Sequence, residues 1–583
     1  MTIAPDLLAR VFAFVADDPD RDTAREALDL VANDDQAALA DRFDGRLEFG
    51  TAGLRGVIGA GPNRMNRAVV RKTTAGLCAY LLRTVPHAHA RGLVIARDGR
   101  RLSDVFARDA ARVATGMGFL VHFFEEPTPT PVCAFAVKDL GAAAGVMITA
   151  SHNPPEYNGY KVYWGNAAQI VPPHDRGIAQ AIDAIASVKD LALVDREAGR
   201  LMGLYLPVLA DVEERYCQAV QALDFGLAKD RSLSIAYTPL HGVGGRFAQR
   251  VLRDAGFENV FVVDRQAEPD AAFPTVRFPN PEEPGAMDLV LALAREKQAD
   301  LVIANDPDAD RIAVGYRSRG GEYLLLSGND VGTLLGHHRL VEDPRPPKNP
   351  LVVTTVVSSP MLGHLAATLG ARYEETLTGF KWIANRAIEL EAKGEAAFVF
   401  GYEEALGATV GDVVRDKDGI GSAVVVALLA AFLKTRGQTL GDRLDEIARR
   451  FGIYVSRQHN EALPGASGAA AIRAMMEGLR SRPPKALGVT EVLSVRDFLA
   501  GEKRFADGRT EALTLPKSNV LTFDLEGGDR IVARPSGTEP KIKFYFDVRV
   551  TPGHGESLDD ARARGKAKLQ AIQDAFLAVA HQG

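Results

Sequence analysis

One local order of elements recurs three times along the chain and constrains its fold more than any other feature. Residues 93–124, "LVIARDGRRLSDVFARDAARVATGMGFLVHFF", have the pattern of a β-branched strand, a polar loop, an amphipathic helix, a glycine stop and another strand. Residues 233–264 and 351–377 repeat this order. Strands that alternate with helices predict parallel pairing through helical crossovers, and hence α/β domains. Because the copies lie far apart, they predict three similar domains rather than a solenoid of short contiguous repeats.

The end of the chain has a different pattern. Residues 518–550 alternate apolar and polar side chains around glycine-rich turns, and residues 558–582 then have a helical pattern. This order predicts an antiparallel sheet with a helix, an α+β domain. We therefore expect four domains at residues 1–224, 225–344, 345–463 and 464–583. The first of them begins with a helical extension of about 45 residues.

Composition excludes several classes of function. The 583 residues are 46% hydrophobic and 25% charged, as in an ordinary globular protein of about three to five domains. A net charge of −6 argues against nucleic acid as a main partner, because phosphate backbones require a dense basic face.

The cysteines and the apolar segments bear on location. Cys78, Cys133 and Cys217 are odd in number and far apart, which favours reduced packing thiols in a cytoplasmic protein. The N-terminus shows no basic start or cleavage signal. The longest apolar run, residues 422–433, falls short of the ~18 residues that span a bilayer and predicts a buried helix. We expect no membrane partner.

The sharpest chemical signal is "LVIANDPDADRIAV", residues 301–314. An apolar strand runs into Asp306, Asp308 and Asp310 at alternate positions, followed by Arg311. Three carboxylates this close repel one another unless a cation lies among them, and a hard divalent ion such as Mg²⁺ prefers oxygen ligands. The alternative is a solvated acidic turn. The position at the end of a buried strand favours the metal, because α/β proteins bind ligands there.

Three further motifs suit a phosphorylated sugar. In "ARPSGTEPKIKFYF", residues 533–546, Arg534, the hydroxyls of Ser536 and Thr538 and the amides around Gly537 form a short anion nest or, alternatively, a plain hairpin turn. "FGTAGLRGVIG", residues 49–59, is a glycine-rich loop with the single Arg55. In residues 400–412, Glu403 and Glu404 are bidentate acceptors for sugar hydroxyls or acids at a helix N-terminus.

Two motifs are misleading. "GVGGRF", residues 242–247, follows a strand as in a dinucleotide-binding fold, but Phe247 takes the place of the glycine that allows close helix–strand packing. His337–His338 and the histidines at 87 and 89 lack a matching third metal ligand. We expect these histidines to lie at the surface or in the packing.

Ser151 lies in "MITASHNPPEYNGYKVYW", residues 147–164. The G-x-S-x-G motif of acyl-transfer enzymes is absent around it, and the adjacent His152 is poorly placed to take a proton from its own neighbour's hydroxyl. Pro154 and Pro155 stiffen the loop, and Lys161 lies beyond it. A phosphorylated serine suits the acidic metal loop and the arginines better than an acyl-serine, since phosphate requires both cation and arginine.

Four ordered motifs together resemble the α-D-phosphohexomutases, namely "TASHNP" (149–154), "DPDADR" (306–311), "GYEEALG" (401–407) and "RPSGTEP" (534–540). "YTPLHGVGG" (237–245) and "TLTGFKWI" (376–383), with the long N-terminal segment, resemble the phosphoglucomutase-2-type branch. The resemblance covers nearly the whole chain. It implies three similar α/β domains with mixed sheets flanked by helices, plus a C-terminal α+β domain, around a central cleft.

The resemblance also implies a mechanism and its residues. Phosphorylated Ser151 would give its phosphoryl group to a sugar monophosphate, and the bisphosphate would turn around and return its other phosphate. Mg²⁺ would be held by Ser151, Asp306, Asp308 and Asp310, with glucose 1,6-bisphosphate as activator. Arg55 and Lys161 match residues that assist proton transfer. The substrate-binding set that the resemblance implies is Arg311, Thr378, Gly379, Glu403, Glu404, Lys417, Arg534, Ser536, Gly537 and Thr538.

The expected activity is the interconversion of glucose 1-phosphate and glucose 6-phosphate by a monomer or homodimer. Many relatives have serine where this chain has Ala405, and loss of a hydrogen bond of ~1 kcal/mol leaves the sugar open. His241 is a candidate to supply an imidazole, or else a turn residue. Phosphomannomutase, phosphopentomutase and bisphosphate synthase remain alternatives within the class. A metal-dependent sugar phosphatase and a non-catalytic sugar-phosphate sensor are the alternatives outside it.

Overall fold

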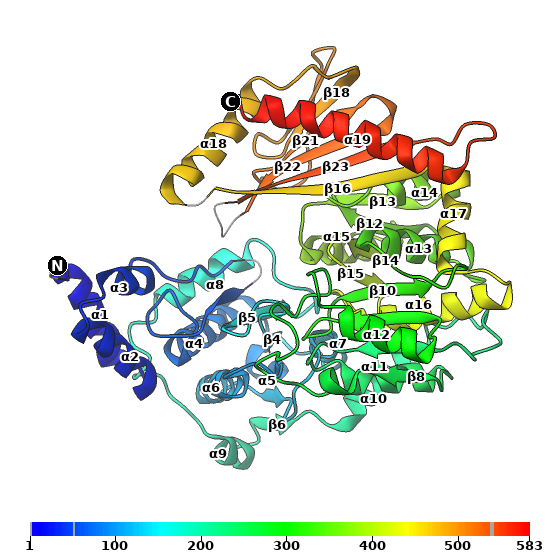
Figure 1. The fold of residues 1–583 in the computed structure, drawn as a ribbon. Coiled ribbons are helices and arrows are strands. Elements are labelled where there is room, and N and C mark those ends of the chain that lie inside the picture. The colour runs from blue at the N-terminus through cyan, green and yellow to red at the C-terminus, as the bar shows by residue number, and fades with distance from the viewer. Residues whose placement is uncertain (1–2, 51–52, 464, 537–540, 583) are drawn as a thin grey trace. The chain divides into compact units, whose positions relative to one another are not determined.

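The computed structural model describes residues 3–50, 53–463, 465–536 and 541–582 (Figure 1). The chain forms two compact units. Unit 1 contains Met1–Ser327 and Ala405–Gly437, and unit 2 contains Gly328–Glu404 and Gln438–Gly583. The segment 405–437, predicted within the third domain, therefore packs with unit 1. The predicted boundaries near residues 225, 345 and 464 stay predictions.

The expected helical extension begins unit 1. It consists of α1 (Pro5–Asp17), α2 (Arg21–Ala32) and α3 (Gln36–Phe43). Asp20 and Asp35 cap the second and third helices by accepting hydrogen bonds from backbone N–H groups in the first turn. Leu7, Val11 and Leu39 pack in a small apolar core of their own.

The first sheet of unit 1 is mixed and has six strands in the order β1-β5-β4-β2-β3-β6. Parallel pairs join β2 to β3 and β4, and β3 to β6, whereas β5 runs antiparallel to both β4 and β1. The central strands are almost fully buried because their residues are apolar and pack on both faces. The bounds are β1 (Leu54–Val57), α4 (Arg67–Thr84), α5 (Ala88–Arg91), β2 (Leu93–Arg97), α6 (Ser103–Gly116), β3 (Val121–Phe123), α7 (Thr130–Asp139), β4 (Ala144–Ile148), β5 (Tyr157–Trp164), α8 (His174–Asp183), α9 (Arg196–Leu201), β6 (Tyr205–Pro207) and α10 (Ala210–Gln221).

The second sheet of unit 1 has the order β11-β10-β9-β7-β8. Strand β7 runs parallel to β8 and β9, and β9 turns back antiparallel into β10. The turn between β9 and β10 carries the three aspartates. The bounds are β7 (Ile235–Thr238), α11 (Gly245–Asp254), β8 (Val260–Val262), η1 (Asp264–Gln266), α12 (Asp288–Lys297), β9 (Leu301–Asn305), β10 (Ile312–Arg317) and β11 (Tyr323–Leu325).

The returning segment of unit 1 contains β15 (Gly407–Val410) and α16 (Gly419–Thr435). Nearly every side chain of α16 is buried, which confirms the predicted buried helix at 422–433. Among the described residues no single helix is long and apolar enough to cross a membrane. Helix α16 reaches the necessary length and apolar character only as a bent pair with α17 (Leu440–Phe451).

Unit 2 combines a parallel β/α arrangement with an antiparallel sheet. Strand β12 pairs in parallel with β13 and β14. The later strands pair antiparallel in the order β16-β23-β22-β21-β18-β19-β20, with β17 beside β18, which confirms the predicted α+β end of the chain. Helix α19 packs on this sheet through Leu569 and Phe576. The bounds are α13 (Gly328–Val341), β12 (Pro350–Thr355), α14 (Met361–Leu369), β13 (Arg372–Thr376), α15 (Phe380–Ala392), β14 (Ala397–Glu403), β16 (Ile453–Ala462), α18 (Gly465–Ser481), β17 (Ala486–Leu487), β18 (Thr490–Asp497), β19 (Glu502–Phe505), β20 (Thr510–Ala512), β21 (Leu521–Leu525), η2 (Glu526–Gly528), β22 (Arg530–Pro535), β23 (Lys541–Val550) and α19 (Leu558–Ala580).

Candidate active site

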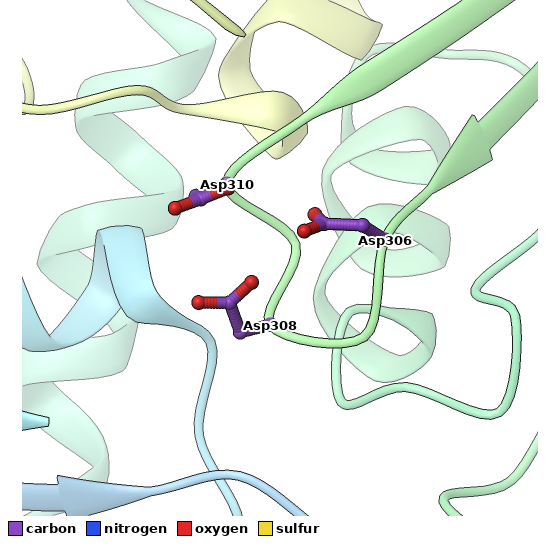
Figure 2. Close-up of side chains that lie close together, drawn as sticks. All are labelled: Asp306, Asp308 and Asp310. Atoms are coloured by element: carbon purple, nitrogen blue, oxygen red, sulfur yellow. The ribbon is translucent and has the colours of Figure 1, made fainter. Parts of the chain in front are cut away.

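The aspartate loop, residues 306–310, begins where the buried strand β9 ends. Asp306, Asp308 and Asp310 are at most 1% exposed, and one carboxylate oxygen from each lies within 4.8 Å of the others. Figure 2 shows the three side chains close together on one short turn. The Oδ1 atoms of Asp308 and Asp310 are buried and accept no hydrogen bond from the described residues. Two unsatisfied anionic oxygens at such a site fit a divalent cation, which prefers carboxylate ligands.

Two lysines balance the charge of this loop. Lys161 Nζ, on β5, lies 2.7 Å from Asp308 Oδ2 and 3.0 Å from Asp310 Oδ2. Lys417 Nζ lies 3.2 Å from Asp310 Oδ2. Burial acts to raise the pKa of Asp308, but the Lys161 ammonium and the hydrogen bonds to this carboxylate, among them that of Thr130, together outweigh it and hold that pKa below its ordinary value. Burial, followed by repulsion from the other two carboxylates, raises the pKa of Asp306 well above its ordinary range. The loop therefore combines ionised and proton-prone carboxyl groups.

The serine loop, residues 149–157, connects β4 to β5. Ser151 is 3% exposed and has a left-handed backbone with a φ of 52°. Its backbone N–H donates to Thr149 Oγ1 at 2.8 Å. Its hydroxyl donates to Asp306 Oδ2 at 2.8 Å. The serine and the aspartate loop, predicted from separate motifs, therefore form one cluster.

The structure corrects the expectation for His152. Its Nδ1 lies 3.1 Å from Ser151 Oγ, so the two side chains are in hydrogen-bonding contact although they are neighbours in the chain. Sequence reasoning missed this contact because it depends on the left-handed turn at Ser151. Burial, followed by the nearby Arg311 and Arg55, holds the pKa of His152 well below its ordinary value. The imidazole beside Ser151 is accordingly neutral.

The remaining predicted cations of unit 1 gather around the two loops. Arg55 lies on β1 opposite Gly159 of β5, and its Nη1 donates to Asn153 Oδ1 at 2.8 Å. The Arg311 backbone N–H donates to Asp306 Oδ1 at 3.0 Å. Asp416 accepts hydrogen bonds from the backbone N–H of Lys417 at 2.8 Å and from Lys417 Nζ at 3.2 Å. The structure thus brings Ser151, Arg55, Lys161, Asp306, Asp308, Asp310, Arg311 and Lys417 together.

The predicted sugar-binding residues lie in unit 2. Glu403, at the end of β14, accepts a hydrogen bond from the Gly379 backbone N–H at 2.9 Å. Thr378 precedes that glycine, and its buried Oγ1 has no hydrogen-bond partner among the described residues. Glu404 instead accepts from Ser358 Oγ at 3.0 Å and Thr355 Oγ1 at 3.4 Å. Glu403, Thr378 and Gly379 therefore form one polar cluster, while Glu404 anchors the loop.

The predicted phosphate nest is described only in part. Arg534 lies on β22 opposite Lys543 of β23, and the Ser536 backbone N–H donates to Lys541 O at 2.7 Å. Gly537 and Thr538 lie outside the described residues. Strands β22 and β23 therefore place the basic residues Arg534, Lys541 and Lys543 near the connection between them.

Sequence reasoning missed two polar residues of the cluster. Thr130, at the start of α7, donates from its hydroxyl to Asp308 Oδ2 at 2.6 Å and from its N–H to Asp308 O at 2.9 Å. Asp416 also accepts from Tyr163 at 2.8 Å and Gln169 at 2.7 Å, which fixes the backbone beside Lys417. Thr130 could have been found from its position, because it is a polar residue at the start of a helix that follows a parallel strand, where α/β proteins bind ligands.

The glycines of the misleading motif support the aspartate loop. A side chain at Gly242 would place its Cβ 2.4 Å from Pro307 Cα, and one at Gly244 would meet Ala309 Cβ at 2.7 Å. His241 is 3% exposed, has a φ of 58° and contacts Thr275 Oγ1 through Nε2 at 2.8 Å. This position favours the interpretation of His241 as a turn residue.

Comparison with known proteins now assigns the chain. Residues 46–189, 214–320 and 327–451 match the family domains described as phosphoglucomutase/phosphomannomutase, alpha/beta/alpha domains I, II and III. These matches place the chain in a class of enzymes that transfer phosphoryl groups within sugar phosphates. The chain belongs to the phosphoglucomutase/phosphomannomutase family of the α-D-phosphohexomutase superfamily, whose members are phosphotransferase isomerases.

Relatives carry names that differ in the sugar. "Probable phosphoribomutase" of Schizosaccharomyces pombe is 38% identical, with 95% of each chain covered. "Probable phosphomannomutase" of Haemophilus influenzae is 40% identical over 83% of this chain and 93% of its own. "Phosphoglucomutase" of Staphylococcus haemolyticus is 35% identical over 87% and 91%. The Paramecium phosphoglucomutase parafusin shares the fold, with a TM-score of 0.67, 19% identity and coverage of 91% and 96%.

Proposed function

We propose that the protein is a Mg²⁺-dependent phosphosugar mutase in which Ser151 carries the phosphoryl group. The observation that carries this proposal is the hydrogen bond of 2.8 Å that Ser151 Oγ donates to Asp306 Oδ2. It places the hydroxyl that would carry the phosphoryl group directly beside the aspartate loop. Asp306, Asp308, Asp310 and an oxygen of phosphorylated Ser151 would hold the ion. Mg²⁺, when bound, neutralises negative charge on the transferring phosphoryl group.

The chain's own residues organise the transfer. The P–Oγ bond of phosphorylated Ser151 breaks as a bond forms to a hydroxyl of the sugar monophosphate. Arg55 and Lys161 assist the removal of the proton from that hydroxyl, and the released Ser151 Oγ takes up a proton. The sugar bisphosphate then turns around, and its other phosphoryl group returns to Ser151. Arg311 and Lys417 supply positive charge to the phosphate oxygens. Glucose 1,6-bisphosphate would restore the phosphoserine, which makes it the expected activator.

Unit 2 contributes proposed substrate-binding residues of its own. Glu403 accepts hydrogen bonds from two neighbouring sugar hydroxyls, and Thr378 and Gly379 line the sugar site. The contacts of Glu404 with Ser358 and Thr355 support an indirect part, in which Glu404 keeps Glu403 in place. Arg534, Ser536, Gly537 and Thr538 hold the phosphate that does not react.

The primary substrate pair is glucose 1-phosphate and glucose 6-phosphate. Ribose phosphates are a second candidate, favoured by the phosphoribomutase name of the Schizosaccharomyces pombe relative and its coverage of 95% of each chain. Ala405 leaves the choice of sugar open, because it lacks the hydroxyl that many relatives offer next to the sugar-binding glutamate. Values of kcat/KM for glucose, mannose, glucosamine and ribose 1-phosphates, measured side by side, decide between them.

Ser151→Ala tests the mechanism itself. We expect the variant to fold with an unchanged melting temperature and to lose mutase turnover on every sugar phosphate, because it lacks the hydroxyl proposed to carry the phosphoryl group. Ser187→Ala is the control, since it removes a hydroxyl of the same unit that donates to Asp17 of α1 at 2.5 Å. Substantial turnover by Ser151→Ala would exclude the phosphoserine, and turnover to free phosphate by the wild type would favour a phosphatase. Cytoplasmic location and a monomeric or homodimeric state stay predictions.

A further inference from the structure

Arg100 lies beneath the serine loop and takes no part in the proposed chemistry. It follows strand β2 in the polar loop "RDGRR", and its side chain is 1% exposed. Its Nη2 donates to Ser151 O at 2.6 Å and to Asn153 O, and its Nη1 donates to Pro154 O at 2.8 Å. Nη1 also donates to Tyr157 O at 3.4 Å, so one guanidinium binds four carbonyl groups of a single short loop.

The guanidinium is itself held from two sides. Asp98 Oδ2 lies 3.4 Å from Arg100 Nε, and Asp98 Oδ1 accepts from the Arg100 backbone N–H at 2.9 Å and from Ser103 Oγ at 2.6 Å. The ring of Phe273 lies 4.9 Å from the guanidinium carbon, in cation–π geometry. Because the partners Asp98 and Phe273 are both buried, they hold the guanidinium in one orientation, with its N–H donors directed at the loop.

The loop needs such a support. Ser151 has a φ of 52°, a left-handed conformation that residues with a Cβ rarely adopt unless surrounding contacts impose it. This conformation directs Oγ at Asp306 while the Ser151 carbonyl faces the interior. A planar fork of donors binds several carbonyls at fixed angles, whereas an ammonium on a flexible stem binds them as a point charge.

We propose that Arg100 is a positioning residue for phosphoryl transfer: its guanidinium holds the carbonyls of Ser151, Asn153 and Pro154 and thereby fixes the serine in the conformation that directs Oγ at the aspartate loop. The proposal rests on the proposed function of Ser151. It does not follow from the motifs of the sequence, because Arg100 precedes Ser151 by 51 residues and meets it only through the parallel pairing of β2 with β4.

Arg100→Lys tests the proposal, with Arg71→Lys as the control. Arg71 is a buried arginine of the same unit that binds Asp109 at 2.8 Å, away from both loops. In the substrate-free enzyme, we expect Arg100→Lys to raise amide hydrogen exchange of residues 149–157 by about tenfold or more. We expect kcat to fall about 10- to 100-fold, as for the loss of other supporting contacts, with KM within about threefold. The control should leave loop exchange and kcat within about twofold of wild type.

Wild-type exchange or wild-type kcat in Arg100→Lys overturns the proposal, and so does an equal loss of kcat in Arg71→Lys. If Arg100→Lys does not fold, Asp98→Asn decides: it keeps the arginine but removes its buried carboxylate, and unchanged loop exchange in that variant overturns the proposal. The exchange measurement needs no substrate. A wild type that turns over no sugar phosphate would therefore contradict the proposed function, while loop exchange would still decide whether Arg100 holds the serine loop.

Discussion

Asp308 shows at the scale of one residue why a metal is expected. Its Oδ2 accepts from Lys161 and Thr130, while its buried Oδ1 accepts no hydrogen bond from the described residues. We predict that Asp308→Asn weakens Mg²⁺ binding by at least about tenfold, because a neutral amide replaces an anionic ligand. Calorimetric titration with Mg²⁺ and activity after EDTA treatment measure this.

Asp300→Asn is the control for that prediction. Asp300 precedes the same strand β9 at its other end, where its carboxylate binds Ser234 and Lys434. The control variant should keep the Mg²⁺ affinity of the wild type. Equal Mg²⁺ affinity in Asp308→Asn, or full wild-type activity in EDTA, would contradict the metal assignment.

Asp418, which caps a helix directly after Lys417, gives a prediction of pH dependence. This buried residue caps α16 by accepting from the N–H groups of Ile420 and Gly421, and it also accepts from Tyr216. Burial raises its pKa from 3.8 to about 6. The folded state therefore binds the proton more tightly than the unfolded state, so the stability that this group contributes is present below about pH 4 and is lost as the pH rises through 6. The difference corresponds to about 3 kcal/mol.

Asp418→Asn removes this titration and keeps a capping side chain. We expect the melting temperature of the variant to match that of the wild type near pH 4 and to exceed it increasingly up to pH 7. Differential scanning calorimetry at several pH values measures the difference. A difference that stays constant between pH 4 and 7 would show that Asp418 does not titrate in this range.

At the same scale, the sequence predicted what lies within one short segment. The metal site was predicted from Asp306, Asp308 and Asp310 because they occupy alternate positions directly after an apolar strand, and the ends of strands in α/β proteins bind ligands. The contact of Lys161 with Asp308 joins residues 147 positions apart, and no local pattern specifies it. Contact between Ser151 and His152 depends on one backbone angle, which side-chain patterns do not reveal.

At the scale of elements, loop 238–245 sets the position of the aspartate loop. The Val243 N–H donates to Pro307 O at 2.8 Å, and Gly242 has no room for a Cβ beside Pro307. We predict that Gly242→Ala displaces the aspartate loop, destabilises unit 1 by about 1 to 3 kcal/mol and lowers kcat. Thermal unfolding and steady-state kinetics measure the two effects.

Gly320→Ala provides the comparison for that substitution. A Cβ at Gly320 would meet only Ser318 Oγ, at 3.7 Å, an ordinary van der Waals distance. This variant should keep both the melting temperature and kcat of the wild type. If Gly242→Ala behaves in the same way, the backbone of the aspartate loop does not depend on this close approach.

The recurring strand–helix pattern predicted the elements well, because each copy begins with a buried strand that contains β-branched residues and continues with a helix. The pattern did not predict that segment 405–437 packs with unit 1. This packing depends on contacts such as that of Tyr216 with Asp418, which join residues 202 positions apart. Local propensity determines where a helix forms, whereas residues distant in the sequence determine which partner it packs against.

At the scale of the whole molecule, unit 2 contains a buried ionic network. Glu375, on β13, binds Arg530 Nη1 at 2.7 Å and also binds Arg496, and Arg530 binds Asp547 at 2.9 Å. Burial acts to raise the pKa of Glu375, but the two arginines outweigh it and hold that pKa below its ordinary value. The network therefore joins the parallel strands of unit 2 to its antiparallel sheet through fixed charges.

We predict that Glu375→Ala destabilises unit 2 by about 3 to 5 kcal/mol, because it leaves two buried guanidinium groups without their shared carboxylate. Native-state hydrogen exchange should show lost protection in β12, β13 and β22, while the sheets of unit 1 keep theirs. Glu389→Ala, which removes an exposed partner of Lys393 and Arg386, should change protection by less than about 0.5 kcal/mol. Equal loss of protection in both units would show that the molecule unfolds as one cooperative body rather than as the two units of its packing.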